Sequence, residues 1–377
     1  MNIEVKEVTN KKMLKAFLAL PDRLYKDHPC YIPPLRFDEE STLRQDKNPA
    51  FAYCLARYWL AYKDAKVVGR IAGIVNNAFI QKWGSRFIRF GWLEFEEDER
   101  IAGALLHSVE EWGRSLQMEG VHGPLGFTDL DHEGLLVEGF DQRGTIAGLY
   151  NHSYYPALLE KAGYGKHTDW VEYKVTIPQA MDSRLEKLAA IVRQRHRLQA
   201  VPLRQTKDVL PYVPAIFELI NSAYADLYGV VPLTEKQIAY YTKQYFSFIR
   251  PDFVSLITDK EGQLAAFSIT MPSLSHALKK AGGKLFPFGF VHLLKALRKN
   301  DTADLLLVAV RKDLQGKGVN AMLMHETLKS YLKNGIRTAE ASHQLEDNKR
   351  VQALWDFFDA TIHKRRRCYI KYLNSES

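Results

Sequence analysis

The sequence contains few cysteines and no long apolar run, and these absences exclude several classes of protein. Cys30, Cys54 and Cys368 lie far apart and form no CxxC pair, so their spacing suits a reducing compartment and predicts neither a disulfide framework nor a metal site. No stretch approaches the roughly 20 apolar residues that a membrane-spanning helix needs. The apolar stretch near the N-terminus is interrupted by Lys15 and ended by Pro21, which favours an amphipathic first helix over a signal peptide.

The composition is that of a folded protein with a surplus of positive charge. Hydrophobic residues make up 46% and charged residues 25% of the chain, which argues against extended disorder. A length of 377 residues exceeds one compact core and predicts two domains. The net charge of +8 suggests an anionic partner, such as nucleic acid, a membrane surface or a phosphorylated cofactor, but it fits a merely basic soluble protein equally well.

Two halves of the chain repeat a similar order of elements. In the first half, residues 51–76 read as two strands joined by a turn near Asp64, followed by a strand at 86–96 and a helix at 98–117. The second half contains strands at 253–259, 264–272 and 303–310, a helix at 319–335, a strand at 338–345, a helix at 348–359 and a strand at 365–373.

This repeat predicts a duplicated α/β protein with a mixed sheet and helices on both faces of the sheet. We expect a first domain over residues 1–177, a helical linker over 178–200 and a second domain over 201–377.

The glycine-bearing turn after strand 303–310 is the most informative motif. A wholly apolar strand leads into it, and a helix begins at its end. Glycines let a backbone approach a ligand closely, and a helix N-terminus offers free N–H groups, so the pattern predicts a diphosphate site to which one lysine adds a mobile charge. The alternative is a tight turn with no ligand. The turn consists of Gln315, Gly316, Lys317, Gly318, Val319 and Asn320.

The order of strand, glycine turn, helix and strand resembles the GNAT superfamily of acyl-CoA-dependent acyltransferases. The family's pyrophosphate loop has the pattern Q/R-x-x-G-x-G/A, which Gln315 and Gly318 fit, whereas Asn320 stands where the family has glycine or alanine. The resemblance implies that acyl-CoA or acetyl-CoA is a substrate and that no metal is needed. It also implies that the backbone of Val308 and Val310 pairs with the pantetheine arm, which Asn348 contacts. Alternatively, the two valines only pack in the core of their strand, and Asn348 only caps the N-terminus of the helix that follows it.

Transfer of an acyl group to an amine needs a group that accepts the amine proton. Asp304 stands six positions before Val310, which predicts the same strand face, and related histone acetyltransferases carry a carboxylate base there. Glu340 and His343 on the next strand are alternative bases, because a histidine titrates near neutrality. Alternatively, Asp304 is only a polar residue at the start of its strand, and His343 is only a surface or packing residue.

The position at which many family members carry a tyrosine as general acid holds Trp355, which is not a useful proton donor. Departure of the thiolate would then depend on water, on Tyr369, or on no acid, since a thiolate is a good leaving group.

The first half lacks the phosphate motif. Its corresponding strand runs into four carboxylates at residues 96–99, which would repel a diphosphate. The sequence therefore predicts a degenerate GNAT-like first domain that does not bind CoA.

An aromatic and basic insert at residues 282–300 separates two strands of the second half. It can lie at a bilayer interface, line a channel for a fatty chain, or form ordinary core. Its candidate acyl or acceptor residues are Leu285, Phe286, Phe288 and Phe290, and its basic residues are Lys284, Lys295, Arg298 and Lys299.

A closer resemblance spans most of the chain and favours the lipid interpretations. It is to the bacterial ceramide synthase-like group of tandem GNAT proteins. The resemblance implies an N-acyltransferase that joins a fatty acyl-CoA to the amine of a long-chain sphingoid-type base, in the cytoplasm or at the inner membrane face. The stretches that carry it include DHPCYIPPLRFDE, YNHSYYPALLEKAGY, DLYGVVPLTEKQIAYY, GKLFPFGF and ADLLLVAVRKDLQGKGV.

Two other functions stay open. One is an acetyltransferase that acts on a small amine or a protein, and the other is an inactive scaffold that binds lipid or protein. Nucleic acid is not expected as a partner, because the basic run at 363–372 reads as an edge strand with solvated arginines, or as a patch that faces anionic lipid or the 3′-phosphate of the cofactor.

Overall fold

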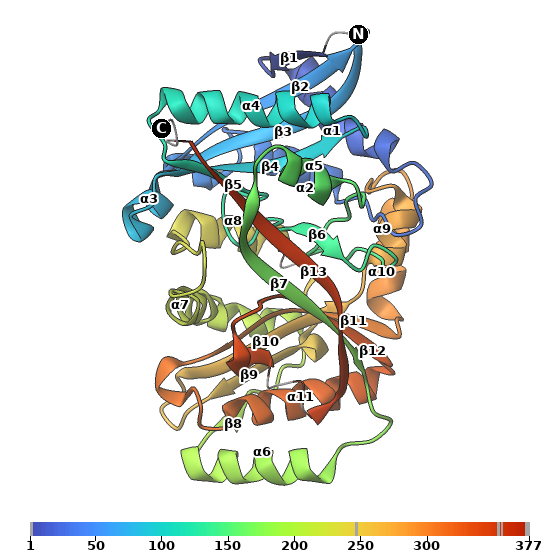
Figure 1. The fold of residues 1–377 in the computed structure, drawn as a ribbon. Helices are drawn as coiled ribbons and strands as arrows, with labels where there is room; N and C mark the ends of the chain where they lie inside the picture. The colour runs from blue at the N-terminus through green and yellow to red at the C-terminus, as the bar shows by residue number, and fades with distance from the viewer. Residues whose placement is uncertain (1–2, 246–247, 353–354, 356, 374–377) are drawn as a thin grey trace. The chain divides into compact units, whose positions relative to one another are not determined.

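The computed structural model describes residues 3–245, 248–352, 355 and 357–373 (Figure 1). The chain divides into two compact units that are not contiguous in sequence. The N-terminal unit comprises Met1–Trp170, Leu278–Gly289 and Lys364–Ser377, and the C-terminal unit comprises Val171–Ala277 and Phe290–His363. Strands β7 (Gly165–Thr176) and β13 (Asp359–Tyr372) therefore each contribute residues to both units. The domain boundaries at 177 and 200 remain a prediction. The sequence did not predict that residues 278–289 and 364–377 would belong to the N-terminal unit.

The N-terminal unit is a mixed sheet in the order β1-β2-β3-β4-β5-β13, with β6 paired to β13. The turn between β2 and β3 is formed by Asp64 and Ala65, which both have positive φ, as hairpin turns favour. The strands are β1 (Ile3–Glu7), β2 (Cys54–Lys63), β3 (Lys66–Asn76), β4 (Phe87–Phe95), β5 (Gly120–Gly123) and β6 (Leu135–Glu138).

Helices of this unit form where the sequence provides caps and apolar faces. The Asn10 side chain caps α1 by accepting a hydrogen bond from the Met13 amide, which confirms the predicted amphipathic first helix. Helix α4 packs its buried face on β3 and β4 (Figure 1). The helices are α1 (Lys11–Leu24), α2 (Arg36–Leu43), α3 (Asn77–Trp83), α4 (Glu99–Ser115) and α5 (Tyr155–Lys161).

Glu94 is a buried carboxylate in the core of the N-terminal unit. The hydroxyls of Tyr25 and Tyr155 donate to its Oε2, and the Arg70 guanidinium lies 3.9 Å from its Oε1. Burial raises the pKa of Glu94 to about 7, against the opposing pull of Arg70 and the two tyrosines.

We expect Glu94→Gln to change how stability depends on pH. Because the folded pKa lies above the unfolded value near 4.5, the folded state holds the extra proton between these values, and stability is lost as pH rises through about 7. The variant lacks this loss. The difference in free energy of unfolding, variant minus native protein, should therefore rise by about 2–3 kcal/mol from pH 5 to pH 8. Urea denaturation of both proteins at pH 5 and pH 8 measures this difference. The same change in stability with pH in both proteins would contradict the prediction.

Strand β13 is not the solvated edge strand that was predicted. Its residues Tyr369 to Tyr372 pair with β5, and Arg365 to Arg367 pair with β6. Arg366 is only 1% exposed and donates to the carbonyl of Leu149. The Arg367 guanidinium holds the Asp169 carboxylate at 2.9 Å. The basic run is therefore largely interior, because its long side chains are paired within the N-terminal unit.

The C-terminal unit contains strands in the order β12-β11-β10-β9-β8. Its strands are β8 (Gln199–Ala200), β9 (Val254–Thr258), β10 (Leu264–Pro272), β11 (Thr302–Val310) and β12 (Thr338–Leu345). Its helices are α6 (Ser183–His196), α7 (Val213–Ala223), α8 (Glu235–Tyr245), α11 (Val319–Asn334) and α12 (Lys349–Gln352). Helix α9 (Ser275–Ala281) precedes the insert, helix α10 (Gly289–Arg298) lies within it, and each has residues in both units.

Two apolar cores lie on opposite faces of this sheet. Helices α6 and α11 pack on one face, and α7 packs on the other. The predicted helical linker at 178–200 does form a helix, and its buried residues Leu185, Ala189 and Val192 belong to the first of these cores. Among the described residues, no helix is long and apolar enough to cross a bilayer.

Candidate functional site

Strands β11 and β12 separate at their C-terminal ends. They pair in parallel from Thr302 and Thr338 to Leu305 and Ala341, and both strands then continue without further ladder pairs between described residues. The Ser342 hydroxyl still donates to the Leu306 carbonyl at 2.9 Å. Beyond that bond, no ladder pair joins β11 to β12 among the described residues, and we call the diverging ends of these two parallel strands the wedge.

A β-bulge at Leu306 marks the start of this wedge. On β10, Ile269 faces Leu307 and Thr270 faces Leu305, so Leu306 is the extra residue of β11. Ala303 and Leu305 lie in the α11 core before the bulge, and Val310 lies there after it. Asp304 therefore points to the face opposite Val310, and the predicted shared face is wrong because an even spacing no longer holds across a bulge.

The backbone of Val308 and Val310 lies on the wedge side, where the cofactor arm was predicted to pair. The Tyr224 hydroxyl donates to the Val308 carbonyl at 2.8 Å and accepts from the Val308 amide at 3.3 Å. The Gln315 amide group donates to the Val310 carbonyl at 3.0 Å. A ligand arm that pairs with Val308 must therefore displace a tyrosine hydroxyl that no sequence motif indicates.

The predicted phosphate turn has the backbone form that its sequence indicates. Gly316 and Gly318 have φ values of 74° and 81°, and Gly318 is the N-cap of α11. Among the described residues, the amides of Gly316, Gly318, Val319 and Asn320 donate to no acceptor, and the Lys317 side chain is exposed. Four adjacent donors at the positive end of a 16-residue helix can hold an anion.

Two carboxylates lie side by side at the closed end of the wedge. Asp304 and Glu340 are register partners in the parallel pair of β11 and β12, and Asp304 is only 2% exposed. Both alternate with core residues on their strands, so both point to the face opposite α11. The structure thus brings two of the predicted bases together.

Histidines from neighbouring strands extend this polar cluster. His343 Nε2 lies 3.4 Å from a carboxylate oxygen of Glu172, and His363 Nε2 lies 3.6 Å from one of Glu340. Ligand atoms of Glu172, Glu340 and His363 all lie within 4.8 Å of one another, so this trio could also hold a cation. Sequence reasoning missed Glu172 and His363, because their strands are distant in sequence and neither stands in a recognisable motif.

The remaining predicted residues of the closing segment have structural contacts. The Asn348 side chain accepts from the Val351 amide at 3.4 Å, so Asn348 caps α12. Trp355 is buried and donates to Gln344 at 3.1 Å, as a core residue would. Tyr369 packs in the core of the N-terminal unit and donates to Glu160, so it does not belong to the unit that contains the wedge.

The insert is more exposed than a core hairpin. Phe286 and Phe288 are 78% and 71% exposed, Phe290 is 41% exposed, and Leu285 is half-buried. Leu285, Phe286 and Phe288 belong to the N-terminal unit, and Phe290 belongs to the C-terminal unit. The reading of the insert as ordinary core is therefore wrong for Phe286 and Phe288, and its acyl or acceptor role stays a prediction.

The N-terminal unit also has two parallel strands that stop pairing before their ends, but it lacks the glycine turn. Strands β4 and β5 pair only from Phe87 to Arg89, and β4 then continues to Phe95. At the start of α4, Asp98 is the N-cap and accepts from the Arg100 amide at 3.0 Å. The chain's own carboxylate thus occupies the anion position, which supports the prediction of a degenerate domain.

Comparisons with known proteins agree with this geometry. Residues 215–358 match the acetyltransferase (GNAT) family model. The chain is 29% identical to Protein YghO of Escherichia coli (strain K12), over 98% of this chain and 95% of that protein. It is 28% identical to the bacterial ceramide synthase of Caulobacter vibrioides (strain NA1000 / CB15N), over 99% of this chain and 98% of that protein.

Solved structures show the same architecture. A tandem GNAT protein from the clavulanic acid biosynthesis pathway superposes with a TM-score of 0.57 at 14% identity and full coverage of both chains. A GCN5-related glucosamine N-acetyltransferase region of a fungal enzyme gives a TM-score of 0.58 at 10% identity, over 98% of this chain and 38% of that one. Residues 215–358 therefore resemble a GNAT acetyltransferase domain, the chain has the fold of tandem GNAT proteins, and these similarities support an N-acyltransferase.

Proposed function

We propose that this chain transfers a fatty acyl group from acyl-CoA to the amine of a long-chain, sphingoid-type lipid base. The observation that supports the transfer is the wedge between β11 and β12, beside a turn with four amides that have no acceptor among the described residues. The lipid class rests on the 28% identity to a bacterial ceramide synthase over 99% of the chain.

The turn and the wedge have complementary roles in binding. The amides of Gly316, Gly318 and Val319 would hold the diphosphate of CoA, and Lys317 would add a charge that closes over it. The pantetheine arm would then pair with the backbone of Val308 and Val310, in place of the Tyr224 hydroxyl. This arrangement directs the thioester toward the closed end of the wedge.

The acidic residues at that end would carry the chemistry. The amine nitrogen attacks the thioester carbon, a C–N bond forms, the C–S bond breaks, and CoA leaves as a thiolate. Asp304 accepts the proton that the amine loses, and Glu340 with His363 can pass it onward. The bulge leaves Leu306 without a register partner on β10, and the backbone amide of Leu306 would stabilise the oxyanion.

Acyl-chain preference tests the lipid assignment. We expect purified protein to use palmitoyl-CoA at least about tenfold more efficiently than acetyl-CoA with a long-chain amino-alcohol acceptor, because each buried methylene contributes about 0.8 kcal/mol to binding. Mass spectrometry of the products measures both reactions in one mixture. Faster turnover with acetyl-CoA and a small amine would support the rival acetyltransferase, and no saturable CoA binding would support the scaffold.

The insert supports a peripheral contact with an anionic membrane. Phe286 and Phe288 project from a turn, and Val291 and Leu294 are each 49% exposed on α10. Basic side chains that are also exposed can contact acidic head groups, and they are Lys284, Lys295, Arg298 and Lys299.

Replacing Phe286 and Phe288 together by aspartate should weaken binding to vesicles of anionic phospholipid at least about tenfold, because two apolar anchors are lost and two charges are repelled. Co-sedimentation measures this, with Leu55→Asp as the control, since Leu55 is 55% exposed on β2. Equal losses in both variants would contradict a specific membrane contact of the insert.

A further inference from the structure

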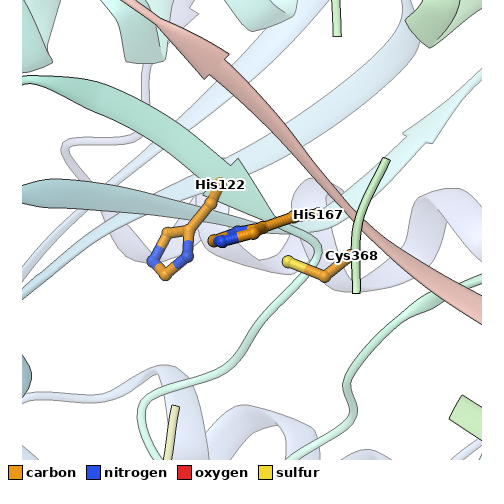
Figure 2. A group of neighbouring side chains, drawn as sticks. All are labelled: His122, His167 and Cys368. Carbon is orange, nitrogen blue, oxygen red and sulfur yellow. The ribbon is translucent and has the colours of Figure 1, made fainter. Parts of the chain in front are cut away.

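Three side chains with metal-binding atoms meet in the N-terminal unit. His122 lies on β5, His167 on β7 and Cys368 on β13, and their ligand atoms all lie within 4.8 Å of one another (Figure 2). We propose that His122, His167 and Cys368 bind one zinc-class transition-metal ion, at a site separate from the acyl-transfer wedge of the C-terminal unit. The sequence predicted no metal, because these residues stand far apart in the chain and show no ligand spacing.

The sheet itself brings the three donors to one place. His122 is the register partner of Ile370 in the antiparallel pair of β5 and β13. Cys368 precedes Ile370 by two residues, so its side chain points to the same face as Ile370 and lies diagonally across from His122. Strand β7, which carries His167, neighbours β13 on the side away from β5. Adjacent paired strands are a stiff frame, which suits a site that must hold fixed ligand positions.

The donor set selects the class of ion. Two imidazole nitrogens and one thiolate suit Zn²⁺, Co²⁺ or Cu, whereas Mg²⁺ and Ca²⁺ prefer oxygen donors. Ligands of a tetrahedral zinc ion lie about 3.3–3.6 Å apart, given metal bonds of about 2.0–2.3 Å. Side-chain rotations that close gaps of at most 4.8 Å to this spacing are enough to form the site. Binding replaces the thiol proton, and a water molecule can fill the fourth position.

The surroundings favour a dry site. The rings of Phe79 and Phe87 lie 5.2 and 5.5 Å from the His122 ring. His122 is fully buried and His167 is half-buried. Arg89 is the register partner of His122 on β4, and its guanidinium donates to the carbonyls of Gly126 and Phe127.

Metal content of the full-length protein tests this inference without any activity assay. The protein is incubated with excess Zn²⁺ or Co²⁺, desalted and analysed by mass spectrometry of the metal. We expect about one ion per chain, and for Co²⁺ a thiolate-to-metal charge-transfer band that reports Cys368 as a ligand. Removal of the ion by a chelator should lower the Tm by at least about 3 °C, because the ion binds only the folded site.

Variants locate the ion. Cys368→Ser and His167→Ala should each lose the ion, with a content at least about fivefold below that of the native protein. Cys54→Ser, which alters a buried thiol in another core cluster, and His107→Ala, which alters an exposed side chain on α4, should keep it.

Three results would overturn the site. They are a native protein with less than about 0.1 ion per chain, bound Co²⁺ without the thiolate band, and native metal content in both ligand variants. Circular dichroism of His167→Ala, whose side chain is half-buried, shows whether a loss of metal occurs in a folded protein.

Discussion

Replacing Gly316 by valine is expected to weaken CoA binding at least about tenfold, which equals 1.4 kcal/mol. Gly316 has a φ of 74°, a region that a β-branched residue strongly disfavours, and a Cβ added there would meet no described atom within 4 Å. We expect the diphosphate to occupy that space, so the added side chain would meet it. Isothermal calorimetry with CoA measures the loss.

Gly335 offers a matched control at the other end of the same helix. It has a φ of 70°, and a Cβ there also meets no atom within 4 Å. Gly335→Val should therefore cost a similar 1–2 kcal/mol or so of stability and leave CoA affinity unchanged. If both variants lose affinity equally, the effect is general destabilisation, and the phosphate role of the turn is refuted.

Replacing Asp304 by asparagine is expected to lower the turnover number at least about tenfold, while CoA still binds. The substitution keeps the size of a side chain that is 2% exposed and removes the only charge that β11 contributes to the closed end of the wedge. Because the amide cannot accept a proton from the amine, the loss should appear in the turnover number and leave the calorimetric affinity for CoA unchanged.

Glu340 and Asp313 separate the role of Asp304 from a general charge effect. Glu340→Gln removes the neighbouring carboxylate and should reduce turnover less than Asp304→Asn, because we propose that Glu340 relays the proton and does not take it from the amine. Asp313→Asn, which removes the exposed partner of Arg311 next to the turn, should leave turnover within about twofold of native. Unchanged turnover in Asp304→Asn would exclude Asp304 as the base.

The local part of the site could be predicted from the sequence. The apolar strand at 303–310, the glycine turn and the helix at 319–335 correspond to β11 and α11, because strong apolar patterns and glycine positions act over a few residues. The hairpin over 51–76 was found for the same reason, since Asp64 stands at its turn.

What depends on distant strand pairing could not be predicted. The bulge at Leu306 shifts the faces of β11 without any glycine or proline to signal it. Glu172 and His363 reach the polar cluster around Glu340 from strands that are neighbours only in the folded sheet. The C-terminal strand was assigned to an edge because its arginines look solvated, whereas Arg366 is buried between paired strands.

A crystal structure with bound CoA tests the central claim most directly. We predict the diphosphate within hydrogen-bond distance of the amides of Gly316, Gly318 and Val319, with the Tyr224 hydroxyl moved off Val308 and the sulfur in the wedge between β11 and β12. CoA bound in the N-terminal unit instead, or a turn that stays empty at saturating CoA, would contradict this mode of binding.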